Sequence, residues 1–273
     1  MAILAIIAGR GTLPVDIAHA ARDGGTDVVL FAIRGQADSD FSDFTHHQID
    51  LGAISKTRAL MVEMGCDRLV MAGKVERPSL GDLRPDGDAL KLLGKALTRG
   101  DDGLLRIICA YFAEAGIETI SPDNFIADRS LSGGVIVDDA KVAALIAPDI
   151  ELGISVLASL GALDVGQAAI IQQGRVIAIE AAEGTDAMIS RAGDLLDLAA
   201  NCATLLKMPK SGQDLRLDRP VFGVTTVTTA QKAGIGAIAI GAESVLLADP
   251  LDDIVTACRA AKIALIGVET QPK

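Results

Sequence analysis

Residues 2–14 read AILAIIAGRGTLP, and they set the architecture of the first part of the chain. Ala2–Ala8 is an uninterrupted apolar run, which is typical of a strand buried in a parallel sheet. Pro14 suits the first turn of a following helix, where its missing N–H costs nothing. After Gly24-Gly25 comes a second apolar run, Asp27–Ile33. The pattern predicts a βαβ unit, the opening of a Rossmann-like domain.

Short apolar runs continue to alternate with helical spacings, so we expect an α/β protein. Gln36–Asp50 is polar and predicts a loop followed by a short edge strand. Elsewhere in the first half we expect strands at Arg68–Ala72 and Glu118–Ile120 and helices at Ile54–Met64, Asp88–Leu97 and Asp102–Ala115.

The composition changes near Ser132-Gly133-Gly134, which we interpret as an interdomain linker. We therefore predict an N-terminal domain with a parallel sheet over residues 1–131 and a C-terminal α/β domain over residues 135–273. Gln173-Gly174 between two apolar runs indicates a hairpin, so the second sheet should be mixed. In this half we expect helices at 138–160 (broken near Pro148), 185–199, 225–233 and 252–261, and strands at 168–172, 175–180, 202–206, 237–240 and 263–267.

Charge and composition exclude several classes of protein. The 273-residue chain has a net charge of −11, and it contains no Trp, one Tyr and six Phe. Both properties argue against binding nucleic acid, which requires cations and favours stacking rings. The four cysteines form no CxxC pair, which disfavours zinc ribbons and disulfides and favours a reduced, cytoplasmic protein. We expect no spanning helix and no signal peptide, because no stretch of 18 or more apolar residues exists and the N-terminus lacks a basic region.

The turn at residues 9–14, which includes Gly11 and Thr12, is one candidate anion site. Its backbone N–H groups would face a phosphate at the N-terminus of the following helix. Pro14 occupies the third glycine position of the dinucleotide fingerprint GxGxxG, and no acidic ribose ligand ends the second strand at Ile33-Arg34. Both features disfavour a dehydrogenase, and a tight turn without a ligand is the alternative.

Two further segments could meet an anion. Gly73 and Lys74 follow an expected strand, and ligands of open α/β sheets bind at the carboxyl ends of strands; a solvated lysine is the alternative. Thr185 and Asp186 begin an expected helix directly after Gly184. Either could be a simple N-cap, but the glycine also opens the helix N-terminus to an anion.

The segment 207–220, KMPKSGQDLRLDRP, reads as an unusually charged loop. Asp214 and Asp218 could hold Mg²⁺, which takes oxygen ligands and keeps several waters. Lys207 and Arg216 could neutralise a pyrophosphate, and the helix that opens at Thr225 could face the same anion. A solvated charged surface is the alternative. The chain has neither a G-x-S-x-G nor an H-E-x-x-H motif, so a serine hydrolase and a zincin are unsupported.

Six motifs in order carry a resemblance that covers almost the whole chain. They are IIAGRGTLP (6–14), AGKVERP (72–78), GDDGLLR (100–106), GQ (166–167), EGTDAM (183–188) and QDLRLDRP (213–220). With this order and length, the chain resembles the LpxI-type UDP-2,3-diacylglucosamine pyrophosphatases of Gram-negative lipid A biosynthesis.

The resemblance implies a two-domain homodimer with its site between the domains. It implies Mg²⁺-dependent hydrolysis of UDP-2,3-diacylglucosamine to UMP and 2,3-diacylglucosamine 1-phosphate (lipid X). Asp218 matches the family's essential aspartate, and Lys74 departs from the small or amide residue that often follows its A-G. Substrate contacts are implied at Thr185 and Asp186, and also at Gly11, Thr12, Gly73, Gln167, Lys207 and Thr225.

Two other functions remain as alternatives, a non-catalytic nucleotide-binding module and an NAD(P)-linked oxidoreductase. Pro14 is the feature against the second. Because the implied substrate carries two acyl chains, and no basic amphipathic helix is evident, we expect a cytoplasmic protein that contacts the inner face of the inner membrane only transiently.

Overall fold

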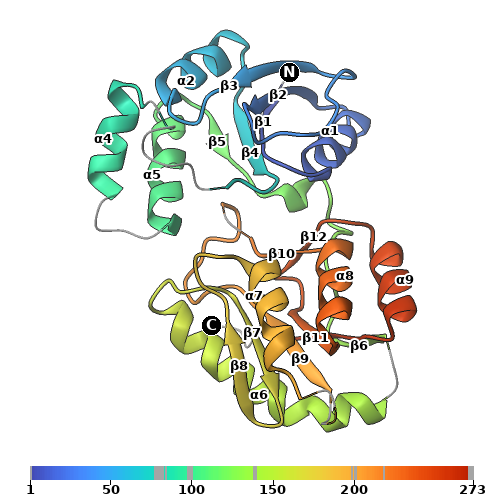
Figure 1. The fold of residues 1–273 in the computed structure, drawn as a ribbon. Helices are drawn as coiled ribbons and strands as arrows, with labels where there is room; N and C mark the ends of the chain where they lie inside the picture. The colour runs from blue at the N-terminus through green and yellow to red at the C-terminus, as the bar shows by residue number, and fades with distance from the viewer. Residues whose placement is uncertain are drawn as a thin grey trace. The chain divides into compact units, whose positions relative to one another are not determined.

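The computed structural model describes residues 2–76, 83, 85–96, 101–137, 140–197, 199, 202–217 and 219–269. The chain forms two compact units, and it passes from the first to the second between Ala127 and Asp128. Each unit has its own sheet and its own helices (Figure 1). Leu131 is fully buried in the core of the second unit.

The first unit is built on a five-stranded sheet with the order β3-β2-β1-β4-β5. Every pair in it is parallel, as predicted. Ile6 of β1 lies between Leu30 and Val70 of its two neighbours, and all three side chains are fully buried. The strand order reverses between β1 and β4, which is the position where open α/β sheets bind ligands. The strands are β1 (Ile3–Ala8), β2 (Asp27–Ile33), β3 (Thr45–Ile49), β4 (Arg68–Ala72) and β5 (Glu118–Thr119).

Helices cover both faces of this sheet. On one face, Phe31 and Leu69 pack with Met61 and Phe112 from two helices. On the other face lies α1, with Pro14 in its first turn as predicted (Figure 1). The described helices are α1 (Leu13–Asp23), α2 (Ile54–Glu63), α4 (Gly87–Ala96), α5 (Asp101–Ala113) and the short 3-10 helix η1 (Pro122–Asn124).

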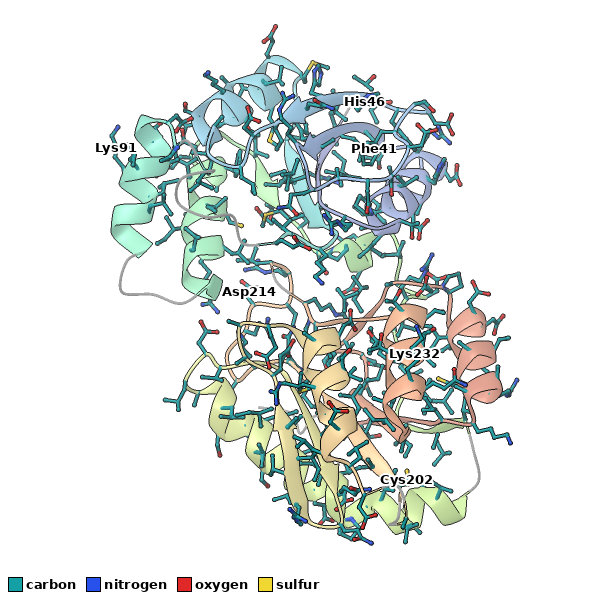
Figure 2. The ribbon with its side chains drawn as sticks, in the orientation of Figure 1. Phe41, His46, Lys91, Cys202, Asp214 and Lys232 are labelled. Carbon is teal, nitrogen blue, oxygen red and sulfur yellow. The ribbon has the colours of Figure 1, made fainter. Side chains whose placement is uncertain are left out.

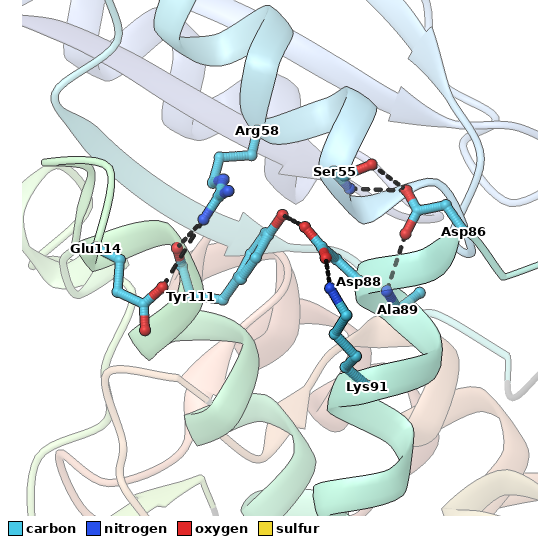
Figure 3. A network of polar contacts seen from close by, with 8 residues as sticks. All are labelled: Ser55, Arg58, Asp86, Asp88, Ala89, Lys91, Tyr111 and Glu114. Atoms are coloured by element: carbon cyan, nitrogen blue, oxygen red, sulfur yellow. Dashed lines mark hydrogen bonds and ion pairs between the residues drawn. The ribbon is translucent and has the colours of Figure 1, made fainter.

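A polar network joins α2, α4 and α5 (Figure 3). The Tyr111 hydroxyl donates to Asp88 at 2.7 Å, and the Lys91 ammonium lies 2.9 Å from the same carboxylate. The Arg58 guanidinium lies 3.7 Å from the centre of the Tyr111 ring. Hydrogen bonds from Lys91 and Tyr111 lower the pKa of Asp88, whereas burial and the bond to Asp88 raise the pKa of Tyr111 to about 12. The network therefore holds three helices together through one aspartate and one tyrosine.

The second unit contains a mixed sheet of six strands with the order β6-β13-β11-β9-β7-β8. The inner strands β13, β11 and β9 are parallel, whereas β6 and β7 pair antiparallel to their neighbours, which confirms the mixed sheet. Gln173 and Gly174 join β7 to β8 with φ of 51° and 72°, the left-handed conformation of a tight hairpin turn. The strands are β6 (Gly134–Val137), β7 (Ala168–Gln172), β8 (Arg175–Ile179), β9 (Ala203–Lys207), β11 (Ile235–Gly241) and β13 (Ala264–Val268). A separate parallel pair, β10 (Val221–Phe222) and β12 (Leu246–Leu247), was not predicted, and neither was β6.

Three helices, α7 (Thr185–Ala192), α8 (Val224–Ala233) and α9 (Leu251–Ala261), lie side by side on one face of this sheet (Figure 1). The prediction that the first of them extends to residue 199 is wrong, because a 3-10 turn, η2 (Gly193–Leu195), ends it. Gly193 follows the last residue of α7, and because glycine is a poor helix former, ending the α-helix there sacrifices little stability.

The other face is covered by α6 (Ala140–Gly161), and the predicted break near Pro148 is wrong. Pro148 and Ala144 lie on the exposed side of the helix, where water can satisfy a carbonyl that has lost its partner. Val142–Gly161 is long and apolar enough to span a membrane, with a mean hydropathy of 1.7. Its residues Ile146 and Leu157 pack against the sheet, whereas only 22% of this stretch is buried, so α6 covers the sheet with one side and leaves the other exposed.

Candidate active site

Three strand ends meet at one edge of the second sheet. Ala168 of β7 lies opposite Lys207, the last residue of β9, and its carbonyl accepts from the backbone N–H of Glu180, which follows β8. Gln167, just before β7, accepts from the Met208 N–H at 2.9 Å through its carbonyl. The antiparallel pairing therefore brings together residues that lie up to 41 positions apart in the sequence.

A chain of polar contacts connects these strand ends to α7. The Lys207 ammonium donates to the Thr185 hydroxyl at 2.8 Å, and this hydroxyl donates to Glu180 Oε1 at 2.7 Å. The second oxygen, Oε2, accepts from the Gln167 N–H at 2.9 Å. Lys207 is 6% exposed and Glu180 is 7% exposed. The expectation that Lys207 belongs to a loop is wrong, because Lys207 is the last residue of β9. The Thr185 hydroxyl is one of the polar partners that offset the cost of burying its ammonium group.

The N-termini of α7 and α8 lie beside this chain of contacts. Gly184 is the N-cap of α7, and no side chain caps that helix, so Thr185 and Asp186 are not N-caps. Asp186 instead accepts from the Thr226 hydroxyl at 3.3 Å, which ties the two helices together, while Thr225 points outward and is exposed. The first N–H of α8 is bound by Asp249 Oδ2 at 2.7 Å. Helix α8 therefore already holds an internal anion.

The charged loop after β9 is held at its start by an ion pair of 2.6 Å between Lys210 and Asp164. Asp214 is partly exposed and lies farther along the loop (Figure 2), and Arg216 is exposed. Asp218 lies outside the described residues. Among the residues that the structure describes, no three His, Cys, Asp or Glu side chains gather into a metal-binding group. Mg²⁺ is commonly held through one or two carboxylates together with the phosphates of a substrate, and Asp214 supplies one carboxylate among the described residues.

In the first unit, the two predicted anion-binding turns lie against each other. The Arg10 N–H donates to the Lys74 carbonyl at 2.8 Å, and the Lys74 N–H donates back at 3.0 Å. Gly73 has φ of +88°, and a Cβ there would lie 2.8 Å from the Arg10 carbonyl oxygen. The turns after β1 and β4 thus form one continuous backbone surface at the point where the strand order reverses.

An aspartate of the first unit occupies part of this surface. The Gly11 N–H donates to Asp38 Oδ1 at 2.8 Å, and Arg10 lies between Asp38, at 3.6 Å, and Glu76, at 3.1 Å. Gly11 and Thr12 are exposed. The Asp38 carboxylate therefore binds the Gly11 N–H, which the sequence predicts to face a phosphate.

Sequence reasoning missed Glu180 and Asp38. Glu180 directly follows β8, and an acidic residue at the end of an apolar run was the available signal. Asp38 belongs to a polar loop without a motif, and only the fold places it beside Gly11.

Comparison with known families and proteins agrees with these two units. Residues 3–129 match the LpxI N-terminal domain and residues 133–266 match the LpxI C-terminal domain. A Caulobacter vibrioides protein named UDP-2,3-diacylglucosamine pyrophosphatase LpxI is 32% identical over 278 residues, which cover 99% of each chain. The chain belongs to the LpxI family. This membership confirms the family resemblance of the six motifs.

Solved structures resemble the LpxI chain only weakly. The precorrin-6A reductase CobK is 10% identical, with a TM-score of 0.37 over 100% of this chain and 89% of its own. The UDP-glucose 4-epimerase of Thermus thermophilus, in complex with NAD, is 13% identical, with a TM-score of 0.32 over 99% and 87%. Similarities this low carry no argument about function.

Proposed function

We propose that this chain hydrolyses the pyrophosphate bond of UDP-2,3-diacylglucosamine. Water adds to one phosphorus, the bond from that phosphorus to the bridging oxygen breaks, and UMP and 2,3-diacylglucosamine 1-phosphate leave. The observation that carries the proposal is the match to both LpxI domains together with the full-length similarity to the Caulobacter vibrioides enzyme. The reaction belongs to lipid A biosynthesis.

Electrostatic stabilisation usually dominates phosphoryl transfer, so the cations of the site carry most of the proposed mechanism. Lys207, held by Thr185, supports this role because its ammonium group has a fixed position at the sheet edge. Arg216 and Lys74 are proposed to neutralise further phosphate oxygens. The remaining proposed substrate contacts are Gly11, Thr12, Gly73, Gln167, Thr185, Asp186 and Thr225.

Asp218 is proposed as the catalytic residue and, with Asp214, as the holder of a Mg²⁺ ion. When bound, Mg²⁺ supplies a Lewis acid that polarises the phosphoryl oxygens. Asp218 lies between Arg216 and Arg219 in the sequence, and neighbouring cations favour the ionised carboxylate. An ionised Asp218 can also orient the attacking water.

The test is release of UMP from UDP-2,3-diacylglucosamine by the purified chain, measured with Mg²⁺ and with excess EDTA. We expect turnover that requires Mg²⁺. Binding of UMP without turnover would instead indicate a nucleotide-binding module. Turnover that is unchanged in EDTA would remove Mg²⁺ from the proposal and leave the reaction in place.

The proposal includes a cytoplasmic homodimer that contacts the inner membrane only through its substrate or an apolar patch. Light scattering of the purified chain should give twice the monomer mass. After cell lysis, the protein should leave washed membranes at high salt, and salt-resistant sedimentation would contradict transient contact.

A further inference from the structure

Among the described acids of the proposed site, Glu180 is the most deeply buried, and it lies outside the six family-like motifs. We infer that Glu180 is a positioning residue that acts through the Thr185 hydroxyl to hold the Lys207 ammonium group for catalysis. The inference rests on the proposed function. It adds to the proposed site a residue that belongs neither to the six motifs nor to the proposed substrate contacts.

The direction of the hydrogen bonds follows from the chemistry of the three groups. A lysine ammonium can only donate, an ionised carboxylate can only accept, and a hydroxyl has a single proton. Thr185 must therefore give its proton to Glu180 Oε1, 2.7 Å away, and accept from Lys207, 2.8 Å away. The carboxylate sets the hydroxyl orientation, and the hydroxyl in turn helps to set where the ammonium group lies.

A carboxylate is required here because two donors converge on it. Thr185 donates to one oxygen of Glu180, and the Gln167 N–H donates to the other. A glutamine at this position has one acceptor and one donor on its amide, so it can satisfy only one of the two contacts. In Glu180→Gln the amide nitrogen faces either the Gln167 N–H or the Thr185 oxygen. The Gln167 N–H then loses its acceptor in the first case, and the Thr185 proton loses its acceptor in the second.

The backbone of Glu180 is held in place on both sides. The Glu180 N–H bonds to the Ala168 carbonyl at 2.9 Å. Gly166 packs so tightly on Glu180 that a Cβ at residue 166, where φ is +47°, would overlap the Glu180 carbonyl oxygen. The backbone of Glu180 is therefore fixed at the strand end, and the Gln167 N–H holds one oxygen of its carboxylate independently of Lys207.

Steady-state kinetics of UMP release test the catalytic part of the inference. Because a small misplacement of a catalytic group can cost up to about a hundredfold, we expect Glu180→Gln and Thr185→Val each to lower kcat about tenfold or more. For Glu180→Gln, which removes no proposed substrate contact, we expect KM to change by less than about threefold, as for an interaction that is made mainly in the transition state. Thr185→Ser keeps the hydroxyl and should restore kcat to within about threefold of the wild type.

Two variants control for the chemical changes alone. Glu151→Gln makes the same replacement at an exposed position on α6, and Thr228→Val makes the same replacement where the hydroxyl bonds only to its own helix. Both should leave kcat unchanged. If Glu180→Gln keeps the wild-type kcat, the catalytic part of the inference is overturned.

Nuclear magnetic resonance of ¹⁵N-lysine-labelled protein tests the positioning part without substrate. The Lys207 ammonium signal, assigned by its loss in Lys207→Arg, should be protected from solvent exchange because the group is buried and hydrogen-bonded. Glu180→Gln and Thr185→Val should speed this exchange at least about tenfold, whereas the two control variants should not.

The two measurements separate the possible failures. A wild-type protein that releases no UMP overturns the proposed function, and the ammonium signal still decides whether Glu180 positions Lys207. An exchange rate that is unchanged in both Glu180→Gln and Thr185→Val overturns the positioning role, whatever the turnover. A variant that fails to fold shows itself in the remaining lysine signals, and Thr185→Ser against Thr185→Val then carries the decision.

Discussion

Replacing Gly73 by alanine should destabilise the first unit more than a strained backbone alone can explain. An L-residue at φ of +88° costs about 1–2 kcal/mol, of which about 0.4–1 kcal/mol is offset by the lower entropy of the unfolded chain. The new Cβ would also lie 2.8 Å from the Arg10 carbonyl oxygen, and overpacking of this kind costs about 1–3 kcal/mol. We expect a total loss of about 2–4 kcal/mol.

Gly116→Ala is the matched control for this change. Its φ is +81°, and a Cβ there would have no atom within 4 Å, so this variant carries the strain without the collision. Urea denaturation of both variants should place Gly73→Ala about 1–3 kcal/mol below Gly116→Ala. Equal stability of the two variants would refute the close approach of the turns after β1 and β4.

Three further results are expected. Asp218→Ala should fold and bind substrate but lose turnover about 10²-fold, which is ~2.7 kcal/mol of transition-state stabilisation, and Asp214→Ala should lose less. Normal turnover of Asp218→Ala with an unchanged thermal melt would exclude the catalytic role. The Tyr111 hydroxyl, with a pKa of about 12 against about 10 in the unfolded chain, should stabilise the fold fully below pH 10 and lose this contribution toward pH 12. Because Tyr111 is the one tyrosine, absorbance follows its ionisation alone, and the loss of stability should be absent in Tyr111→Phe. Limited proteolysis should cut ligand-free protein near Ala127–Asp128, where the chain passes between the units and is exposed, and cut it more slowly with UMP present; cleavage within residues 2–115 instead would contradict a linker there.

Much of the fold could be predicted from local patterns. The apolar run of β1, the proline in the first turn of α1 and the Gln173-Gly174 hairpin each have a local physical cause, and the structure confirms all three. The continuity of α6 at Pro148 could not be predicted, because it depends on which side of the helix faces water. Strands of two or four residues such as β10 and β6 have no period of their own and form only by pairing with a partner.

The candidate site was predictable in its residues but not in its contacts. Lys207 looked like a loop cation because the sequence shows a charge beside Pro209 and Lys210, whereas the hydroxyl that helps to hold it lies 22 positions earlier. Glu180 looked like the polar end of a strand, and only the fold, which pairs β7 with β8 and starts α7 beside them, reveals its two donors. Asp218 stays a prediction, because it lies outside the described residues.

The position of β6 in the second sheet has a consequence for how the protein is made. β6 is the first strand of its unit in the sequence, and it pairs with β13, the last. The sheet of the first unit needs no residue beyond Thr119, so it can close on the ribosome while the rest of the chain is still being translated. The second sheet must wait for residues 264–268. A ribosome that stalls before them releases a chain in which β6 and β11 lack the strand between them, and such unpaired edges invite aggregation.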